Sequence, residues 1–224
     1  MKRHLTAAVA LASLCLAAPA LAANGNIGIY FDTDAALCQG TIPCGQTGTM
    51  YLFGLLQGSS GTGITGAEFG ITPSSATLWT NYLFNEILPP GAGAIGSAFG
   101  PAATGINIFW PSCQVGDGTK VLLMTVPVFN VGCAATEYKM TVRKKDSASN
   151  QFFQCPLFTL CDDPIFTKIC LGSNLTICQN PEPPRPLNST CSTSGTAYLN
   201  PGPTRNCTVG VEKGTWSSMK GLYR

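Results

Sequence analysis

The amino-acid sequence predicts an all-β fold: an antiparallel β-sandwich with a disulfide-rich irregular C-terminal segment and a short terminal helix. Short apolar segments with an alternating pattern recur along the chain, and clusters of turn-forming residues separate them. The cysteines provide the second observation, because six of the eleven lie at or after Cys155, in a stretch rich in Pro, Asn, Ser and Thr. Such a stretch buries little apolar surface, so we expect disulfides to hold it in place.

The stretch 106–133 is predicted to form the central hairpin of the sandwich. Two β-rich apolar runs flank the turn-forming pair Asp117-Gly118. The second run, 121–129, is apolar on both alternating faces at all but one position, which predicts a strand buried on both sides. Pro127 cannot donate a ladder hydrogen bond, so it must lie at an edge, a bulge or a strand end.

Alternation and turn signals predict five further strands, at 26–32, 49–56, 64–71, 137–144 and 151–158. In the third of these, Phe69 lies on the predicted core face and Glu68 points outward. The fourth strand has a charged outer face, which is typical of a sheet edge.

Two segments between these strands are less regular. The segment 74–88 fits either a strand pair or a short helix, and 89–105 is dominated by Gly, Ala and Pro, which predicts a long loop.

The start of the chain has the three parts of a secretory signal peptide: positive charge, a short apolar run and a small-residue cleavage site after Ala22. No later segment is long and apolar enough for a membrane helix, so we expect the mature chain in the extracellular space, the periplasm or at the cell surface. The predicted organisation is a signal peptide at 1–22, a β-sandwich domain at 23–158, a cysteine- and proline-rich extension at 159–210 and a short amphipathic tail at 211–224.

The tail has Trp216, Met219 and Tyr223 at helical spacing. Two interpretations remain open. In the first, the tail packs as a short helix on the sandwich or stays loose. In the second, it is an attachment or sorting signal recognised by export or surface machinery.

Removal of the signal peptide removes Cys15 and leaves ten cysteines, an even number that predicts disulfides in an oxidising compartment. We expect pairing within an early group of four and a late group of six. If residues 117 and 118 form a hairpin turn, Cys113 and Cys133 lie too far apart to bond to each other. The predicted disulfide residues are Cys38, Cys44, Cys113, Cys133, Cys155, Cys161, Cys170, Cys178, Cys191 and Cys207.

Charge and histidine content exclude several classes of function. The one histidine, His4, lies in the signal peptide, so the mature chain lacks Ser-His-Asp and Cys-His nucleophile systems and histidine zinc sites. Residues 23–119 contain five acids and no base, and residues 120–224 contain eleven bases and six acids. No basic patch with interleaved aromatics is present, so nucleic-acid binding is not expected. No cofactor motif is found either.

Carboxylates provide two weak candidate sites. Glu68 and Glu86 could form the acid pair of a glycosidase, although two solvated acids are the favoured interpretation. Asp32 and Asp34, together with Glu68 or Asp117, could bind calcium, but the spacing matches no complete calcium loop. The pair at 162–163 is a second possibility. We assign no catalytic residue and no metal site from these patterns.

Aromatic residues suggest a third candidate. Trp79 and Trp110, with Tyr82 and Phe84, could present a stacking platform for sugar rings. Aromatic residues in a sandwich are more often part of the core, and that interpretation is favoured here.

Several motifs support a resemblance between the mature chain and a group of uncharacterised secreted bacterial proteins. These motifs are NIGIYFD, GITGAEFGI, INIFWPSC, CPLFTLCDDPIFTKIC and TWSSMKGLYR. The pattern GITGAEFGI followed by KVLLMTVPVF is also similar to cohesin-like, immunoglobulin-like and carbohydrate-binding sandwiches. The resemblance implies a sandwich architecture and no functional residue.

We therefore expect a secreted, non-catalytic structural or binding module whose ligand is a glycan or a surface protein. The alternatives are a carboxylate-dependent glycan hydrolase and a cysteine-rich protease inhibitor that uses residues 155–207.

Overall fold

The structure is a computed structural model that describes residues 25–57, 60–146, 155–162, 168–170 and 196–201. The predicted signal peptide, the terminal tail and most of the cysteine-rich extension lie outside these residues. Within the described part, no helix is long and apolar enough to cross a membrane.

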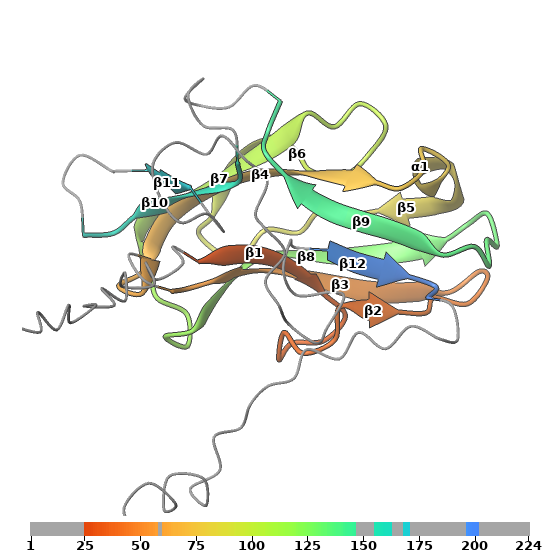
Figure 1. The fold of residues 1–224 in the computed structure, drawn as a ribbon, viewed down its shortest axis with the longest axis horizontal. Coiled ribbons are helices and arrows are strands. Elements are labelled where there is room, and N and C mark those ends of the chain that lie inside the picture. The colour runs from red at the N-terminus through yellow and green to blue at the C-terminus, as the bar shows by residue number, and fades with distance from the viewer. Residues whose placement is uncertain (1–24, 58–59, 147–154, 163–167, 171–195, 202–224) are drawn as a thin grey trace, which may run out of the picture.

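The described chain folds as a β-sandwich, which confirms the predicted fold class (Figure 1). The first sheet has the order β1 (Asn26–Tyr30), β3 (Thr47–Leu55), β8 (Lys120–Asn130) and β5 (Tyr82–Phe84). The second has the order β11 (Lys168–Cys170), β10 (Leu157–Leu160), β4 (Ile64–Pro73), β9 (Tyr138–Arg143), β12 (Thr196–Leu199) and β2 (Gln39–Gly40). Two further strands, β7 (Gly105–Gln114) and β6 (Gly93–Ser97), extend it from β4. All pairings are antiparallel except that of β12 with β2.

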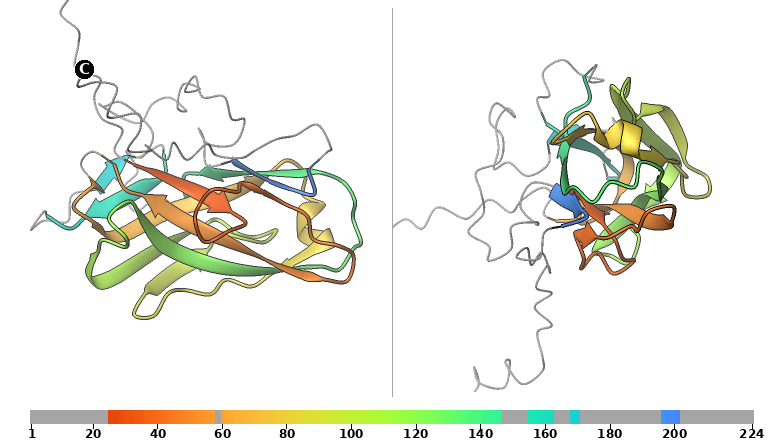
Figure 2. Two further views of the ribbon diagram at one scale, coloured as in Figure 1. Left: turned by 90° about the horizontal axis from the view of Figure 1, so that it is seen from below. Right: turned by 90° about the vertical axis from the view of Figure 1, so that its right-hand side faces the viewer.

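The apolar faces of the two sheets meet in one core, and the end-on view in Figure 2 shows the sheets around this common interior. In β7 and β9 buried side chains alternate with more exposed ones over most of the strand, whereas β4 and β12 are buried at consecutive positions. Among the most deeply buried are Ile27, Ile29, Met50, Leu52, Phe69, Tyr82, Ile106, Ile108, Leu123, Val126, Val128, Met140 and Phe158.

The predicted central hairpin is wrong in one respect, because β7 and β8 do not pair with each other. The turn itself forms, with the Gly118 amide donating to the Val115 carbonyl at 2.9 Å. Beyond the turn β7 pairs with β4 and β6, whereas β8 pairs with β3 and β5. The stretch is therefore an arch between the two sheets. Its two apolar runs both face the core, one from each sheet.

Strand β8 is also less buried than predicted. Val121, Leu123, Val126 and Val128 are buried, while the alternate side chains on the outer face are only half-buried. The register between β3 and β8 shifts between Leu52 and Phe53, and this irregularity changes which of the alternate β8 side chains face the core.

Pro127 is tolerated because of the strand beside it. Its carbonyl accepts from the Asn85 amide at 3.0 Å, so the missing N–H faces the β5 side. Strand β5 ends at Phe84, one residue earlier. The proline therefore interrupts no regular ladder on that side.

Three local expectations change in the structure. The segment 74–88 contains both alternatives, the one-turn helix α1 (Leu78–Asn81) and then β5. The predicted loop 89–105 contains β6. Strand β9 is not an edge strand, because β12 pairs with it on the side away from β4.

A second, smaller apolar cluster lies outside the main core, where residues 31–40 fold over β1 and β3. It comprises Tyr30, Ala35, Cys38, Phe53 and Tyr198. The Tyr30 ring lies on Gly28, where an added Cβ would approach its hydroxyl to 2.5 Å. Burial, and to a lesser extent the charge of Asp32, raises the pKa of Tyr30 to about 12.

Two disulfides connect described residues. Cys44 bonds to Cys133, within the early group, and Cys113 bonds to Cys161. The second bond crosses between the two groups, so the expectation of pairing only within each group is wrong. It arises because the arch carries Cys113 into the second sheet, beside the end of β10. Cys38 and Cys155 are disulfide-bonded as well.

Truncation of the core side chain Leu123 to alanine should lower the free energy of unfolding by about 2–5 kcal/mol, because it leaves a cavity between the sheets. Denaturant unfolding of the oxidised chain measures this change. The matched control is Ile95→Ala on the outer face, which should change stability by less than about 0.5 kcal/mol. Equal losses in the two variants would contradict the assignment of β8 to the core.

Tyr30 should remain protonated well above pH 10. Because its pKa is raised in the folded state, the associated stability is fully present below the unfolded pKa of 10.0 and is lost as the pH rises through about 12. In a spectrophotometric tyrosine titration, the difference between the wild type and Tyr30→Phe should be centred near 12. A difference centred near 10 would show that the ring is not buried.

Candidate functional site

Glu68 is not a solvated acid, contrary to the sequence-based prediction. Its side chain is on the outer face of β4 as predicted, but only 2% of the residue is exposed. It lies between Asn107 of β7 and Leu157 of β10 in the cross-strand register, and the Asn107 amide donates to Oε2 at 3.2 Å. A carboxylate held in this way does not face an open cleft as a hydrolase would require.

Glu86 accepts hydrogen bonds from a separate group of donors. Its Oε1 accepts from the Ser97 hydroxyl and from the amides of Ala98 and Phe99, each at 2.8 Å. These bonds join the segment after β5 to the end of β6, and thus one edge of the first sheet to one edge of the second. Glu68 and Glu86 share no hydrogen-bond partner among the described residues, so the structure does not bring them together as an acid pair.

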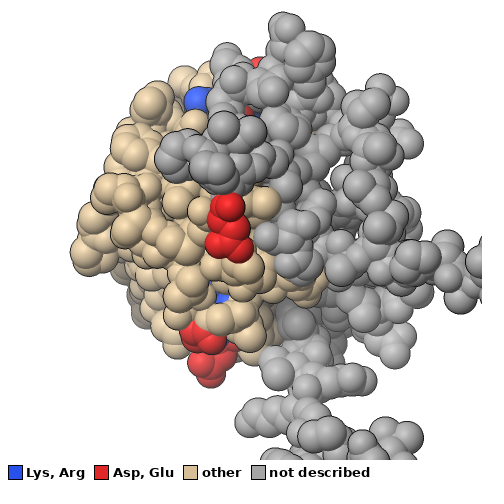
Figure 3. Space-filling view, turned by 90° about the vertical axis from the view of Figure 1, so that its left-hand side faces the viewer, with Lys and Arg blue, Asp and Glu red and all other residues tan. Residues whose placement is uncertain are grey.

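The calcium candidates act as local turn acceptors. Asp32 Oδ1 accepts from the amides of Ala36 at 2.9 Å and Leu37 at 3.0 Å, and Asp34 is exposed. Among the described residues, no three acidic, histidine or cysteine side chains lie close enough to hold a metal ion. Figure 3 agrees, because the acidic side chains in full view stand apart on a largely uncharged surface.

Asp117, the third calcium candidate, belongs to the turn of the arch. Hydrogen bonds from the side chain of Thr119, from Lys120 and from the backbone amides of both hold the pKa of this carboxyl well below its usual range. Asp162 is exposed, and its neighbour at 163 lies outside the described residues.

The predicted sugar-stacking platform is not formed by the tryptophans. Trp110 is a core residue with 6% exposure, which corrects its assignment as a stacking residue. Trp79 is half-buried and packs edge-on against Phe84, with ring centroids 5.3 Å apart, and against Phe99 at 6.3 Å. Phe84 and Phe99 stack at 5.1 Å. These three rings close the end of the core between β5 and β6.

Most of the exposed apolar side chains lie on or beside the strands at one edge of each sheet. Seven large apolar residues are exposed in the described part of the chain, and five of them lie on or beside β5, β6, β7 and the end of β8. We call these five the apolar rim: Leu83, Ile87, Ile95, Phe109 and Val131. The other two, Leu37 and Val115, lie in the loop after β1 and in the turn of the arch.

Strand register places the members of the apolar rim on outward faces. Leu83 lies opposite Phe129, and Ile87 forms a bridge with Thr125 on the outer face of the first sheet. Ile95 is opposite Asn107 on the outer face of the second sheet, two positions from the Gly93–Phe109 pair. The Phe109 ring covers Gly93, where an added Cβ would lie 2.5 Å from it, so the glycine lets the ring lie flat on the sheet.

The rim is almost free of charge. Between Glu68 and Asp117 the sequence contains one charged residue, Glu86, and its Oε1 is turned toward residues 97–99. The charged residues of the second sheet are Glu68 on β4, which lies opposite Asn107, Lys139 and Arg143 on β9, and Lys168 on β11. Sequence reasoning missed the rim because Leu83, Ile87 and Ile95 lie in segments whose strands it did not resolve. The long uncharged stretch was the signal that could have indicated it.

Comparison with known proteins adds limited information. No family model matches the sequence, and no curated protein matches it. A cohesin module from a family 33 glycoside hydrolase of Clostridium perfringens is similar with a TM-score of 0.45 and 12% identity, covering 66% of this chain and 90% of that chain. The sixth cohesin of scaffoldin B from Acetivibrio cellulolyticus, solved in complex with a Cel5 dockerin, gives 0.41 and 14%, covering 69% and 95%.

A third similar structure is the seventh ScaB cohesin from Pseudobacteroides cellulosolvens, with a TM-score of 0.37, 10% identity, and coverage of 56% of this chain and 81% of that chain. All three of these structures are cohesin modules. The likenesses are loose, and the description of the fold rests on the strand pairing given above.

Replacement of Glu86 with alanine should lower the free energy of unfolding by about 1–3 kcal/mol, because the amides of Ala98 and Phe99 lose their acceptor while buried. Denaturant unfolding measures the change, with Glu86→Gln as the variant that keeps an acceptor oxygen. The control Asp34→Ala removes an exposed acid and should have little effect. A Glu86→Ala variant as stable as this control would show that the carboxylate does not hold the two edges together.

Proposed function

We propose that the mature chain is an exported, non-catalytic binding module that docks a protein partner through the apolar rim. The proposal rests on five exposed apolar side chains at the edges formed by β5 and β6, with Leu83 and Ile87 on the first sheet and Ile95 and Phe109 on the second. Exposed apolar surface of this kind marks sites of association. The two disulfides are consistent with an oxidising compartment.

The chemistry of the rim favours a protein over a glycan or a membrane. Four of its five members are aliphatic, and sugar recognition relies on exposed aromatic faces flanked by polar groups. Surface binding to lipid relies on basic side chains beside apolar ones, and the sequence between Glu68 and Asp117 has none. An apolar, rigid and uncharged edge fits the central part of a protein–protein interface.

The two alternatives have less support. A glycan hydrolase would need Glu68 and Glu86 in one cleft, and each instead has separate partners. A protease inhibitor would use residues 155–207, most of which lie outside the described residues, and this function stays an unsupported alternative.

Site-specific photo-crosslinking in the native host tests the proposal. A photoreactive amino acid placed at Leu83, Ile87 or Ile95 should form a covalent adduct with one discrete protein when the chain is exported and irradiated. The same amino acid at Val115, which is 50% exposed but lies in the turn of the arch, is the matched control and should give no adduct.

Leu83→Asp and Ile95→Asp should each weaken binding to the identified partner by about tenfold or more, because each removes buried apolar contact and buries a charge. Val115→Asp should leave binding unchanged. Adducts of equal yield from Val115, adducts with lipid, or binding that persists in the Leu83→Asp and Ile95→Asp variants would overturn the proposal.

A further inference from the structure

The Cys44–Cys133 disulfide lies on an exposed corner of the sandwich, with Cys133 two residues after the rim member Val131. It joins the loop before β3 to the loop after β8, with the two Cα atoms 4.2 Å apart. Both cysteine residues are exposed, and so are Pro43, Gly45 and Gly132 beside them. Reagents in solution can therefore approach this bond from outside.

Hydrogen bonds hold the same two loops together without the disulfide. The buried Asn130 side chain donates from Nδ2 to the Ile42 carbonyl at 2.8 Å. The Gly45 amide donates to the Asn130 carbonyl at 3.0 Å, and the Asn130 amide donates to the Gln46 carbonyl at 3.1 Å. The loops would thus stay side by side if the sulfur–sulfur bond opened.

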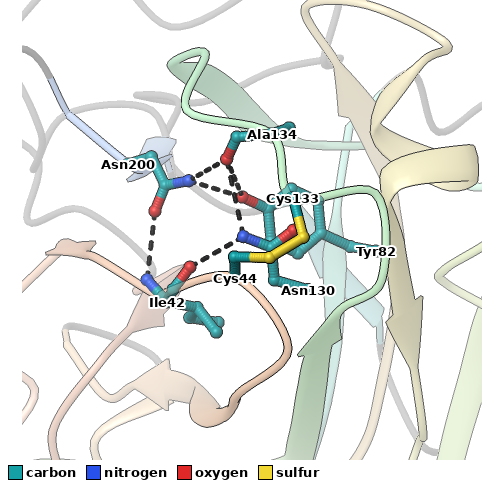
Figure 4. The surroundings of a disulfide bond; sticks show 7 residues. All are labelled: Ile42, Cys44, Tyr82, Asn130, Cys133, Ala134 and Asn200. Carbon is teal, nitrogen blue, oxygen red and sulfur yellow. Dashed lines mark hydrogen bonds between the residues drawn. A yellow bond between two sulfur atoms is a disulfide. The ribbon is translucent and has the colours of Figure 1, made fainter.

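A third segment completes this network, as Figure 4 shows. Asn200, just after β12, accepts the Ile42 amide on Oδ1 at 3.0 Å and donates from Nδ2 to the Ala134 carbonyl at 2.8 Å. The Tyr82 hydroxyl also donates to the Ala134 carbonyl, at 3.2 Å. The corner is therefore tied to the core independently of its disulfide, and the two sulfurs would remain within reach of each other after reduction.

The surroundings of the bond give an attacking thiolate access to it. Both cysteines line a recess of about 310 Å³ whose remaining walls, residues 41–43, 130, 134–135 and 200–201, are uncharged. An incoming thiolate therefore meets no negative charge among these wall residues.

We propose that Cys44–Cys133 is a thiol–disulfide exchange site that accepts electrons from a dithiol on another exported protein. The thiolate of that dithiol attacks one sulfur of the pair and forms a mixed disulfide, and the other sulfur leaves as a thiolate and takes a proton from solvent. The second thiol of the reductant then loses its proton and attacks the mixed disulfide. The products are two cysteine thiols in this chain and a disulfide in the reductant, so two electrons are transferred.

The Cys113–Cys161 disulfide provides a matched control within the same molecule. Cys113 Sγ lies against Gly63, where an added Cβ would be 2.7 Å away, and contacts the Thr62 carbonyl at 3.7 Å. Cys161 is half-buried, and its amide donates to the Gly63 carbonyl at 3.2 Å. Cys113 is exposed, as Cys44 and Cys133 are, so the difference between the two bonds lies in Cys161, which is less exposed than either cysteine of the other pair.

Partial reduction of the oxidised mature chain with dithiothreitol, followed by alkylation and peptide mass spectrometry, tests the proposal. Cys44 and Cys133 should be alkylated at least about tenfold faster than Cys113 and Cys161, as expected for the more exposed bond. Circular dichroism should remain unchanged at this stage, and removal of the reductant should restore the bond. Equal rates for the two pairs, or loss of structure together with alkylation of Cys44, would overturn the proposal.

A variant pair tests the independence of the fold. The double variant Cys44→Ser/Cys133→Ser should unfold at a temperature close to that of the wild type, because the hydrogen bonds through Asn130 and Asn200 remain. The single variant Cys44→Ser should form a mixed disulfide at Cys133 with a single-cysteine peptide supplied as its symmetrical disulfide, which releases one peptide thiol into solution. Failure of the double variant to fold would assign the bond a purely structural role and contradict the proposal.

Discussion

The fold depends on the requirement that both sheets bury their apolar faces against each other. The arch between β7 and β8 meets this requirement, because it sends two consecutive apolar runs to opposite walls of one core. A hairpin would have placed both runs in the same sheet and left the facing sheet without its central strand. The positions of β5 and β6 at the neighbouring edges, and hence the exposed apolar groups there, follow from this arrangement.

Carboxylates in this chain hold structure together. Glu86 joins two sheet edges, Asp32 orders the loop after β1, and Asp117 shapes the turn of the arch. Each accepts several hydrogen bonds from backbone amides or nearby side chains, which is a stabilising arrangement for a charged group. Of these acids Glu86 lies between β5 and β6, and its Oε1 is engaged by residues 97–99.

The sequence identified which face of a strand is buried better than it identified which strands are neighbours. Alternation correctly placed Ala67, Phe69 and Ile71 in the core, and likewise Tyr138, Met140 and Val142. Strand pairing depends on contacts between residues far apart in the chain. Local alternation therefore could not predict the arch, the inner position of β9 or the burial of Glu68. Strand β6 was missed because its Gly and Ala residues are typical of a loop. The role of Glu86 was missed because a single sequence does not show whether an acid in a turn is solvated or accepts hydrogen bonds from a distant segment.

Strand β12 fills the place between β9 and β2, and all four of its residues are buried. This late strand joins two neighbours that are formed from residues 39–40 and 138–143. Until residue 199 is available, the β9 edge stays open and Met140 loses part of its cover. The native sheet can therefore form only after nearly the whole polypeptide is available. A truncated product lacking β12 would leave the backbone groups of the β9 edge unpaired and open to pairing with another chain.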